Sequence, residues 1–238
     1  MTQQQRVDGQ PAFLLHAYPY SETSLIADVF SRDFGRLALL ARGARRPRSV
    51  LRGVLLAFQP LELGWAGKGE VKTLMRAEWQ GGQPLLAGPA LFFAYYLNEL
   101  LMSLLPREDA HARLFSIYGE TLRRLAAGAQ EADLRCFERS LLQELGYGLL
   151  LEYDSEGKAV VADAQYRYEI ERGPLRVALA ESSPLAVSGR TLLDLAREDL
   201  SDPRSLNEAK LLMRTMIAHY LGGRMLASRR IFKELREL

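Results

Sequence analysis

The sequence predicts an α+β protein, in which a small barrel or strongly curved sheet is followed by a mainly helical region. Residues 12–79 alternate short apolar runs with turn residues, which gives five candidate strands in about 70 residues. Glycine and proline then recur between Gly81 and Pro89 and mark a boundary. Beyond that boundary the apolar residues follow a helical period.

Each of the first elements has a local signal. An apolar run is stopped by Pro19, and a turn ends at Gly35, so strands are expected on both sides of that turn. The expected strands are 12–18, 24–30, 36–41, 54–65 with a bend at Pro60, and 71–77. In the last strand, alternation predicts one apolar face and one wet, mainly basic face. The apolar face holds Val71, Thr73, Met75 and Ala77, and the wet face holds Lys72, Arg76 and Glu78.

The second half reads as helices interrupted by one irregular stretch. Residues 91–105 are apolar on nearly all sides, which predicts a central buried helix. The helix at 203–221 has the clearest signals, because Asp202 can cap it and Pro203 fits its first turn. Further helices are expected at 114–125, 134–145, 189–200 and 228–238, and a short hairpin at 166–170 and 175–179.

The most unusual stretch runs from Gly35 to Gly53 and contains six arginines and no acidic residue. The whole chain is nearly balanced, with 31 Lys+Arg and 29 Asp+Glu, so positive charge is concentrated here. Guanidinium groups are permanently charged and donate paired hydrogen bonds to phosphate oxygens. The stretch therefore predicts a loop that binds a sugar-phosphate backbone, although a solvated charged loop without a partner would show the same pattern. The candidate phosphate contacts are Arg36, Arg42, Arg45, Arg46, Arg48 and Arg52, with Lys68, Lys72 and Arg76 beside them.

The residues needed for catalysis or metal binding do not form any recognisable pattern. The three histidines are far apart, and Cys136 is the only cysteine, which excludes a zinc site built from several thiolates. No phosphate-binding loop, dinucleotide fingerprint or nucleophile elbow is present. The N-terminal residues lack the apolar core of a signal peptide. We therefore expect a soluble intracellular protein without catalytic activity, metal, cofactor or membrane association.

An ordered set of short motifs resembles the RecO family of bacterial recombination mediators. Each motif is weak alone, but together they run from near residue 10 to near residue 232. They are Tyr20–Leu25, Gly43–Arg45, Ser49–Gly53, Gly67–Leu74, Leu97–Leu101, Leu145–Gly148, and Tyr220–Gly223 followed by Ser228 and Arg229.

The resemblance implies an OB-fold β-barrel at residues 1–80 and a helical domain at 81–238 with an irregular insertion at about 147–187. Some family members carry a cysteine-rich zinc module in that insertion, but this chain has no cysteine there, so no zinc is expected. The resemblance also implies binding of single- and double-stranded DNA, and annealing of complementary strands. It further implies replacement of the single-stranded-DNA-binding protein SSB by RecA together with RecR, in the cytoplasm and associated with the nucleoid.

Two further sets of residues are candidates for contacts with partners. OB-folds stack bases on aromatic rings, for which Tyr18, Tyr20 and Trp65 are candidates, although packing within the protein would also explain each ring. The segment around Arg135 resembles the helix by which the family binds the acidic C-terminal tail of SSB. Its candidate residues are Arg123, Arg124, Arg135 and Arg139. An OB-fold that binds RNA, or a scaffold whose arginines bind an acidic protein, are the alternative interpretations.

Overall fold

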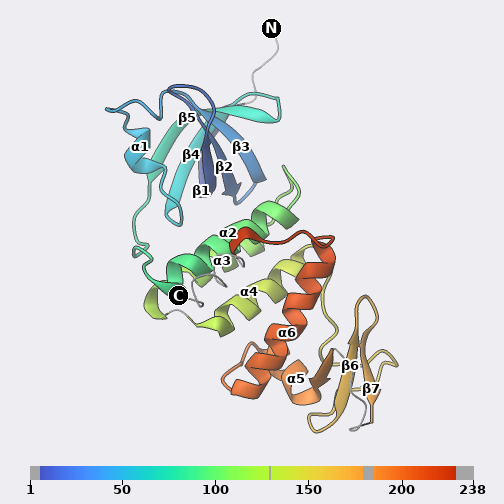
Figure 1. Ribbon diagram of the computed structural model, residues 1–238. Coiled ribbons are helices and arrows are strands. Elements are labelled where there is room, and N and C mark those ends of the chain that lie inside the picture. The colour runs from blue at the N-terminus through green and yellow to red at the C-terminus, as the bar shows by residue number, and fades with distance from the viewer. Residues whose placement is uncertain (1–5, 129, 179–184, 229–238) are drawn as a thin grey trace. The chain divides into compact units, whose positions relative to one another are not determined.

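The computed structural model describes residues 6–128, 130–178 and 185–228. The chain first forms five strands with one short helix, then helices with a small second sheet (Figure 1). The first elements are β1 (Arg6–Pro19), β2 (Leu25–Ser31), β3 (Gly35–Ala41), α1 (Leu51–Val54), β4 (Pro60–Ala66) and β5 (Val71–Trp79). They are followed by α2 (Pro89–Leu104), α3 (Ala112–Gly128), α4 (Glu131–Glu144), β6 (Gln165–Glu169), β7 (Gly173–Val177), β8 (Ala186–Ser188), α5 (Gly189–Arg197) and α6 (Pro203–Tyr220).

The first five strands close into a barrel in the order β1-β2-β3-β5-β4, with β4 pairing back to β1. All pairs are antiparallel except β3 with β5, which run parallel over only three residue pairs. This is the five-stranded arrangement of an OB-fold. The predicted α+β class, with a barrel before a mainly helical region, is confirmed.

The barrel interior is filled by one apolar cluster. Inward-facing leucines and alanines of β1 to β4 pack around Trp65, which is 1% exposed and meets Phe34 edge to face at a centroid distance of 5.4 Å. The predicted strand at 54–65 is too long, because β4 begins only at Pro60 and residues 51–54 form α1. Proline has no N–H to donate to a ladder, so it is accommodated at the first residue of a strand.

The predicted faces of the last barrel strand are wrong because β5 contains a register shift. Gly64 pairs with Arg76, but Trp65 pairs with Leu74, so Met75 has no partner across the ladder. Such a bulge reverses the alternation beyond it. Leu74 and Ala77 therefore pack against the core, whereas Val71 and Met75 are 49% and 57% exposed.

The outer face of β1 and β2 is covered by α2 and α3. Phe13 and Phe30 are paired residues on this face, and their rings meet the rings of Phe115 and Tyr118 from α3 at centroid distances of 5.0–6.4 Å. The buried Asn98 of α2 donates from Nδ2 to the Leu15 carbonyl, at 2.8 Å. Its Oδ1 accepts from the Tyr118 hydroxyl at 2.5 Å, and burial raises the pKa of that hydroxyl. The barrel and the two helices thus share one buried interface.

The loop between α2 and α3 closes against the barrel at the start of β3. The backbone N–H of Glu108 donates to the Arg36 carbonyl at 3.0 Å. The backbones of Arg107 and Arg36 form an isolated parallel β-bridge. Gly35 has a φ of +64°, and the Asp109 carbonyl oxygen lies where a β-carbon of residue 35 would be. Only glycine fits this approach of two backbones.

The chain divides into two compact units. The first unit contains the residues up to Gly128 and those from Leu226 onward. The second unit contains the residues between them, up to Met225. In the first unit, the Glu99 carboxylate accepts from the backbone N–H groups of Ala227 and Ser228 at 2.6 and 2.9 Å, and from the Ser228 hydroxyl at 2.5 Å. The division predicted near residue 80 stays a prediction, and the predicted final helix lies outside the described residues from position 229 onward.

The second unit combines α4, α5 and α6 with a three-stranded sheet of order β7-β6-β8. The hairpin predicted at 166–170 and 175–179 is confirmed as β6 and β7, but β8 is an additional strand of only three residues, too short for a periodic signal. The Asp202 carboxylate accepts from the Ser205 backbone N–H at 3.1 Å, which confirms the predicted cap of α6.

A carboxylate on α6 connects that helix to β8 and α5. Glu208 accepts from the Ser188 backbone N–H at 2.8 Å, and from the Ser188 and Thr191 hydroxyls and Arg204 Nε at 2.7–2.8 Å. Burial acts to raise the pKa of Glu208, but these hydrogen bonds outweigh it and hold the pKa below its ordinary value.

We expect Glu208→Gln to lower the free energy of unfolding at pH 7 by about 1–2 kcal/mol, because it removes charge-assisted hydrogen bonds. A carboxyl whose pKa is lower in the folded state stabilises the fold above its unfolded pKa, roughly 4.3, and loses that effect as the pH falls through the folded value. Urea unfolding at pH 7 and near pH 3 should therefore give a wild-type advantage that shrinks in acid. An advantage equal at both pH values would contradict the assignment.

Candidate nucleic-acid interface

Two loops meet at one end of the barrel. The ladder between β2 and β3 ends where Leu25 pairs with Ala41, so the turn before β2 and the turn after β3 leave the barrel together. Arg45 connects them, because its backbone N–H donates to the Thr23 carbonyl at 2.9 Å and its Nη1 donates to the Ser21 carbonyl at 2.6 Å. We call residues 42–52 the arginine loop and residues 20–24 the β1–β2 loop.

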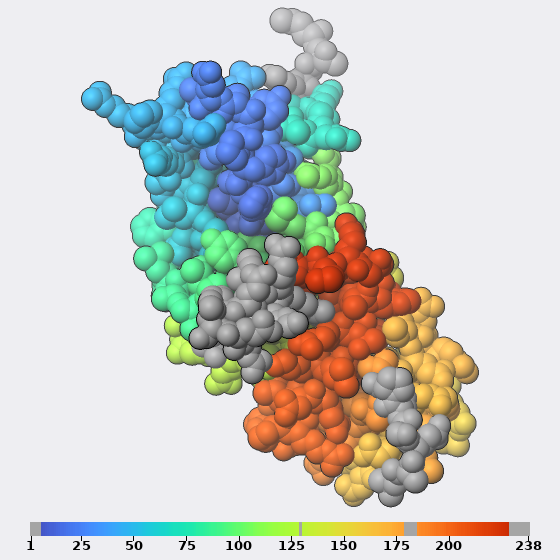
Figure 2. All heavy atoms as spheres, in the orientation of Figure 1, coloured from blue at the N-terminus to red at the C-terminus, as the bar shows by residue number. Residues whose placement is uncertain are grey.

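The arginine loop is exposed and carries uncompensated charge. Five of its side chains are exposed, and within the described part of the chain none has a carboxylate oxygen within 4 Å, although Glu22 lies in the neighbouring β1–β2 loop. They are Arg42, Arg45, Arg46, Arg48 and Arg52. Figure 2 shows this loop, in light blue, projecting from the surface of the barrel. Such a cationic projection attracts anions, phosphates above all.

Arg36 does not belong to this loop. It lies near the start of β3, beside the loop between α2 and α3, and is only partly exposed. Burial, and then repulsion from Arg107, lowers the pKa of its guanidinium, while Asp28 acts in the opposite direction. The Asp28 carboxylate pairs with Arg107 at 3.1 Å, so one of the two positive charges here is already neutralised and Arg36 lies half buried beside that pair.

The three basic residues of the β4–β5 hairpin are also separated from the arginine loop or neutralised. Lys68 is exposed in the turn, but the parallel pairing of Val71 with Ala38 places that turn toward the opposite end of β3. Lys72 lies on the same face as Leu74, is 11% exposed and pairs with Glu108. Arg76 pairs with Glu78 at 2.6 Å, and this pair raises the pKa of the guanidinium. Lys72 and Arg76 are thus poorer phosphate ligands than the loop arginines.

Of the three candidate aromatic rings, two are accessible. Trp65 fills the barrel core, so it cannot stack on a base. Tyr20 is 65% exposed in the β1–β2 loop, beside the arginine loop, and Tyr18 is 39% exposed with its ring against His16. Tyr20 therefore combines exposure with the cationic surface that an OB-fold uses for stacked bases.

The four arginines considered for a protein tail lie in different environments. Arg123 and Arg124 are exposed on α3, and both pair with Glu120, at 2.6 and 3.4 Å. Arg135 is buried on α4 and pairs with Glu138 at 2.6 Å, so both partners are almost inaccessible. Arg139 is partly exposed and pairs with Glu198 at 2.7 Å. The spacing of Arg135 and Arg139 on one helix gave no sign that Arg135 is buried.

The structure also bears on two other kinds of site, a metal centre and a membrane-spanning helix. Among the residues it describes, no three histidine, cysteine, aspartate or glutamate side chains are placed so as to hold a metal ion. No helix in the described ranges is both long and apolar enough to cross a membrane.

Sequence reasoning missed the role of Arg45 in joining two loops, because no local pattern signals a contact across 24 positions.

Comparisons with known proteins cover the whole chain. Residues 8–82 match the family model "Recombination protein O N terminal", and residues 87–230 match "Recombination protein O C terminal". The chain is 63% identical to the DNA repair protein RecO of Dechloromonas aromatica and 55% identical to that of Aromatoleum aromaticum, with all of both chains covered in each case. It is 50% identical to that of Nitrosospira multiformis, over 98% of each chain. The chain therefore belongs to the RecO family of DNA repair proteins.

Proposed function

We propose that this protein binds single- and double-stranded DNA through the arginine loop and anneals complementary strands. The observation that supports the proposal is a set of five exposed arginines without carboxylate partners among the described residues, next to the exposed ring of Tyr20. Contacts to phosphates carry no sequence information. A mediator that must act on any sequence requires such indifference.

Annealing needs more than affinity, because two polyanionic strands repel each other. A cationic loop that neutralises phosphates of one strand lowers this repulsion for the incoming strand. The five loop arginines lie at one barrel end, while Arg36 is partly buried away from the loop and Lys72 and Arg76 are paired with carboxylates, so the loop is the main contact and Lys68 a secondary one. No bond-breaking step and no cofactor or metal is part of this mechanism.

In the cell, we propose that the protein acts in the cytoplasm at the nucleoid, where it helps replace SSB by RecA together with RecR. Membership of a family named for DNA repair and recombination supports this role. Residues 1–80 would provide the DNA-binding barrel, and residues 81–238 the helical region that contacts proteins, with an insertion at about 147–187 that needs no zinc.

Annealing of SSB-coated oligonucleotides tests the proposal directly. Two complementary labelled strands, each saturated with SSB, should form duplex several times faster with the protein than without it. The rate should fall as salt rises, since neutralising about five phosphates gives a slope of roughly −3 to −4 for log affinity against log salt. No acceleration, together with a slope near zero, would contradict annealing by an electrostatic contact.

The proposed site for the SSB tail is tested separately with a labelled acidic tail peptide. Replacing both Arg123 and Arg124 with alanine should weaken binding of the peptide about three- to tenfold, because exposed charge pairs contribute about 0.2–1 kcal/mol each. Arg139→Ala, a single substitution, should weaken binding of the peptide about two- to fivefold. Arg135→Ala also leaves the buried Glu138 carboxylate without this partner, so its effect on the free energy of unfolding has to be measured alongside. Equal affinity in all variants would remove these arginines from the site.

A further inference from the structure

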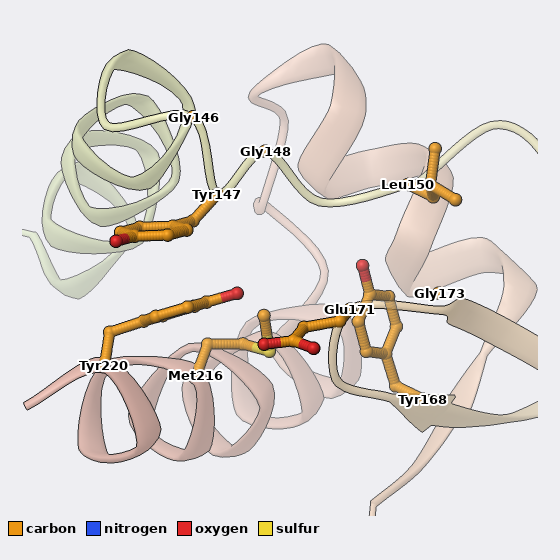
Figure 3. Close-up of a pocket in the computed structure, with 9 residues that line it drawn as sticks. All are labelled: Gly146, Tyr147, Gly148, Leu150, Tyr168, Glu171, Gly173, Met216 and Tyr220. Atoms are coloured by element: carbon orange, nitrogen blue, oxygen red, sulfur yellow. The ribbon is translucent and has the colours of Figure 1, made fainter. Parts of the chain in front are cut away.

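A cavity of about 270 Å³ lies within the second unit. It is formed by the residues that follow α4, the last turns of α6, and the β6–β7 hairpin (Figure 3). Its lining residues are Gly146, Tyr147, Gly148, Leu150, Tyr168, Glu171, Gly173, Met216 and Tyr220. None of them belongs to the arginine loop or to the four arginines considered for the SSB tail.

Aromatic rings form much of the cavity wall. Tyr147 and Tyr220 stack with a centroid distance of 4.1 Å and an interplanar angle of 17°. Tyr168 forms another side of the cavity. Figure 3 shows the Tyr220 hydroxyl and the Glu171 side chain pointing toward the space between Tyr168 and the stacked pair. Burial, and then the nearby Glu171 and Tyr147, raise the pKa of Tyr220, so its hydroxyl stays neutral at physiological pH.

Glu171 is the only charged residue among those that line the cavity. It occupies the turn between β6 and β7 with a φ of +67°, and 73% of its side chain is exposed. Its Oε1 lies 3.9 Å from Nε2 of the half-exposed His219, and no lysine or arginine lines the cavity. The carboxylate is therefore placed where an incoming ligand can reach it.

The chemistry of this wall selects one kind of ligand. A phosphate or a carboxylate would be repelled by Glu171, and a purely apolar group would displace water from the carboxylate without offering it a hydrogen bond. A cation satisfies both features, because aromatic rings attract positive charge and the carboxylate and hydroxyl oxygens accept its hydrogen bonds. Guanidinium fits best, since it is flat, stacks on rings and donates in several directions.

We propose that this cavity is a docking site for an arginine side chain presented by a partner protein. The occupant is thus opposite in charge to the ligand of the arginine loop, and the site is independent of the proposed DNA binding. One molecule could then hold nucleic acid on the first unit and a basic protein segment on the second.

The test uses the full-length protein and a five-residue peptide, Gly-Gly-Arg-Gly-Gly with blocked ends. NMR shifts of the Tyr147 and Tyr220 rings should change saturably with this peptide. A matched peptide with citrulline, which keeps the shape but not the charge, should bind at least about fivefold more weakly. Glu171→Gln should weaken binding of the arginine peptide about two- to fivefold, because the substitution removes the charge and keeps the size.

The control is Glu156→Gln, which removes another exposed carboxylate of the same unit, one that pairs with Lys158 at 2.6 Å outside the cavity. It should leave the peptide affinity unchanged. Equal binding of the citrulline peptide, unchanged affinity in Glu171→Gln, or ring shifts caused instead by an acidic peptide or by oligothymidylate would overturn the proposal. DNA annealing should be unaffected by Glu171→Gln, so a failure here is distinguishable from a failure of the proposed function.

Discussion

Replacing Arg46 and Arg48 with glutamate is expected to weaken binding of a single-stranded oligonucleotide about 100-fold at moderate salt. Both side chains are exposed in the arginine loop and make no hydrogen bond or ion pair with any described residue, unlike Arg45, which connects the two loops. Each change would remove a proposed phosphate contact and add a repulsive charge. Fluorescence anisotropy with a labelled oligothymidylate at several salt concentrations measures the effect.

The matched control reverses two arginines on the same unit that already have carboxylate partners. Arg6 pairs with Asp8 and Arg32 pairs with Asp33, both at 2.9 Å and both largely exposed. The double variant Arg6→Glu with Arg32→Glu has the same net charge as the loop variant, so it isolates position from total charge. Arg46→Ala with Arg48→Ala should also reduce the steepness of the salt dependence by roughly 1.4. If the control and the loop variant lose affinity equally, the loop is not the contact.

Gly35→Ala is expected to lower the free energy of unfolding by about 3 kcal/mol or more, or to prevent folding. A β-carbon at this position would lie 1.8 Å from the Asp109 carbonyl oxygen, and the backbone φ of +64° is itself unfavourable for alanine. Relief of the overlap requires moving the α2–α3 loop away from β3. That movement would break the hydrogen bond from Glu108 to Arg36.

Gly9→Ala is the control for this experiment, because Gly9 has nearly the same φ, +66°, but nothing lies within 4 Å of a β-carbon built there. Gly9→Ala should lower the free energy of unfolding by only about 1 kcal/mol, which is the part that comes from the unfavourable backbone φ alone. Chemical denaturation of both variants gives the difference. Equal losses would mean that the contact between Gly35 and Asp109 is not tight in solution.

The features that local chemistry specifies could be predicted from the sequence. Asp202 and Pro203 mark the start of α6, and the turn residues between the strands mark the barrel, because caps and turns act over a few positions. The reversal within β5 could not be predicted, since the bulge at Met75 is a property of the pairing with β4, where Trp65 lies opposite Leu74. The three-residue strand β8 could not be predicted either, because it is held by its pairing with β6.

In the candidate site, too, some features follow from the local sequence and others depend on the fold. An exposed cluster of arginines follows from the absence of nearby acidic residues, and the arginine loop carries five such side chains. Arg36 belongs to the arginine-rich stretch in sequence and Lys72 to β5, but each lies beside a residue far along the chain, Arg36 near Arg107 and Lys72 paired with Glu108. Tyr20 and Trp65 were equal candidates by type, and only the fold separates a surface ring from a core ring.

The contact between Glu99 and residues 227 and 228 has a consequence for biosynthesis. When the ribosome has made the barrel and its first two helices, the carboxylate of Glu99 still lacks the three donors that it will later receive. Nearly a hundred residues, including the whole second unit, must be translated before those donors exist. The part of the molecule that is synthesised first is therefore among the last to be completed, and a nascent chain arrested before position 226 should resist proteolysis less at α2 than the released protein does.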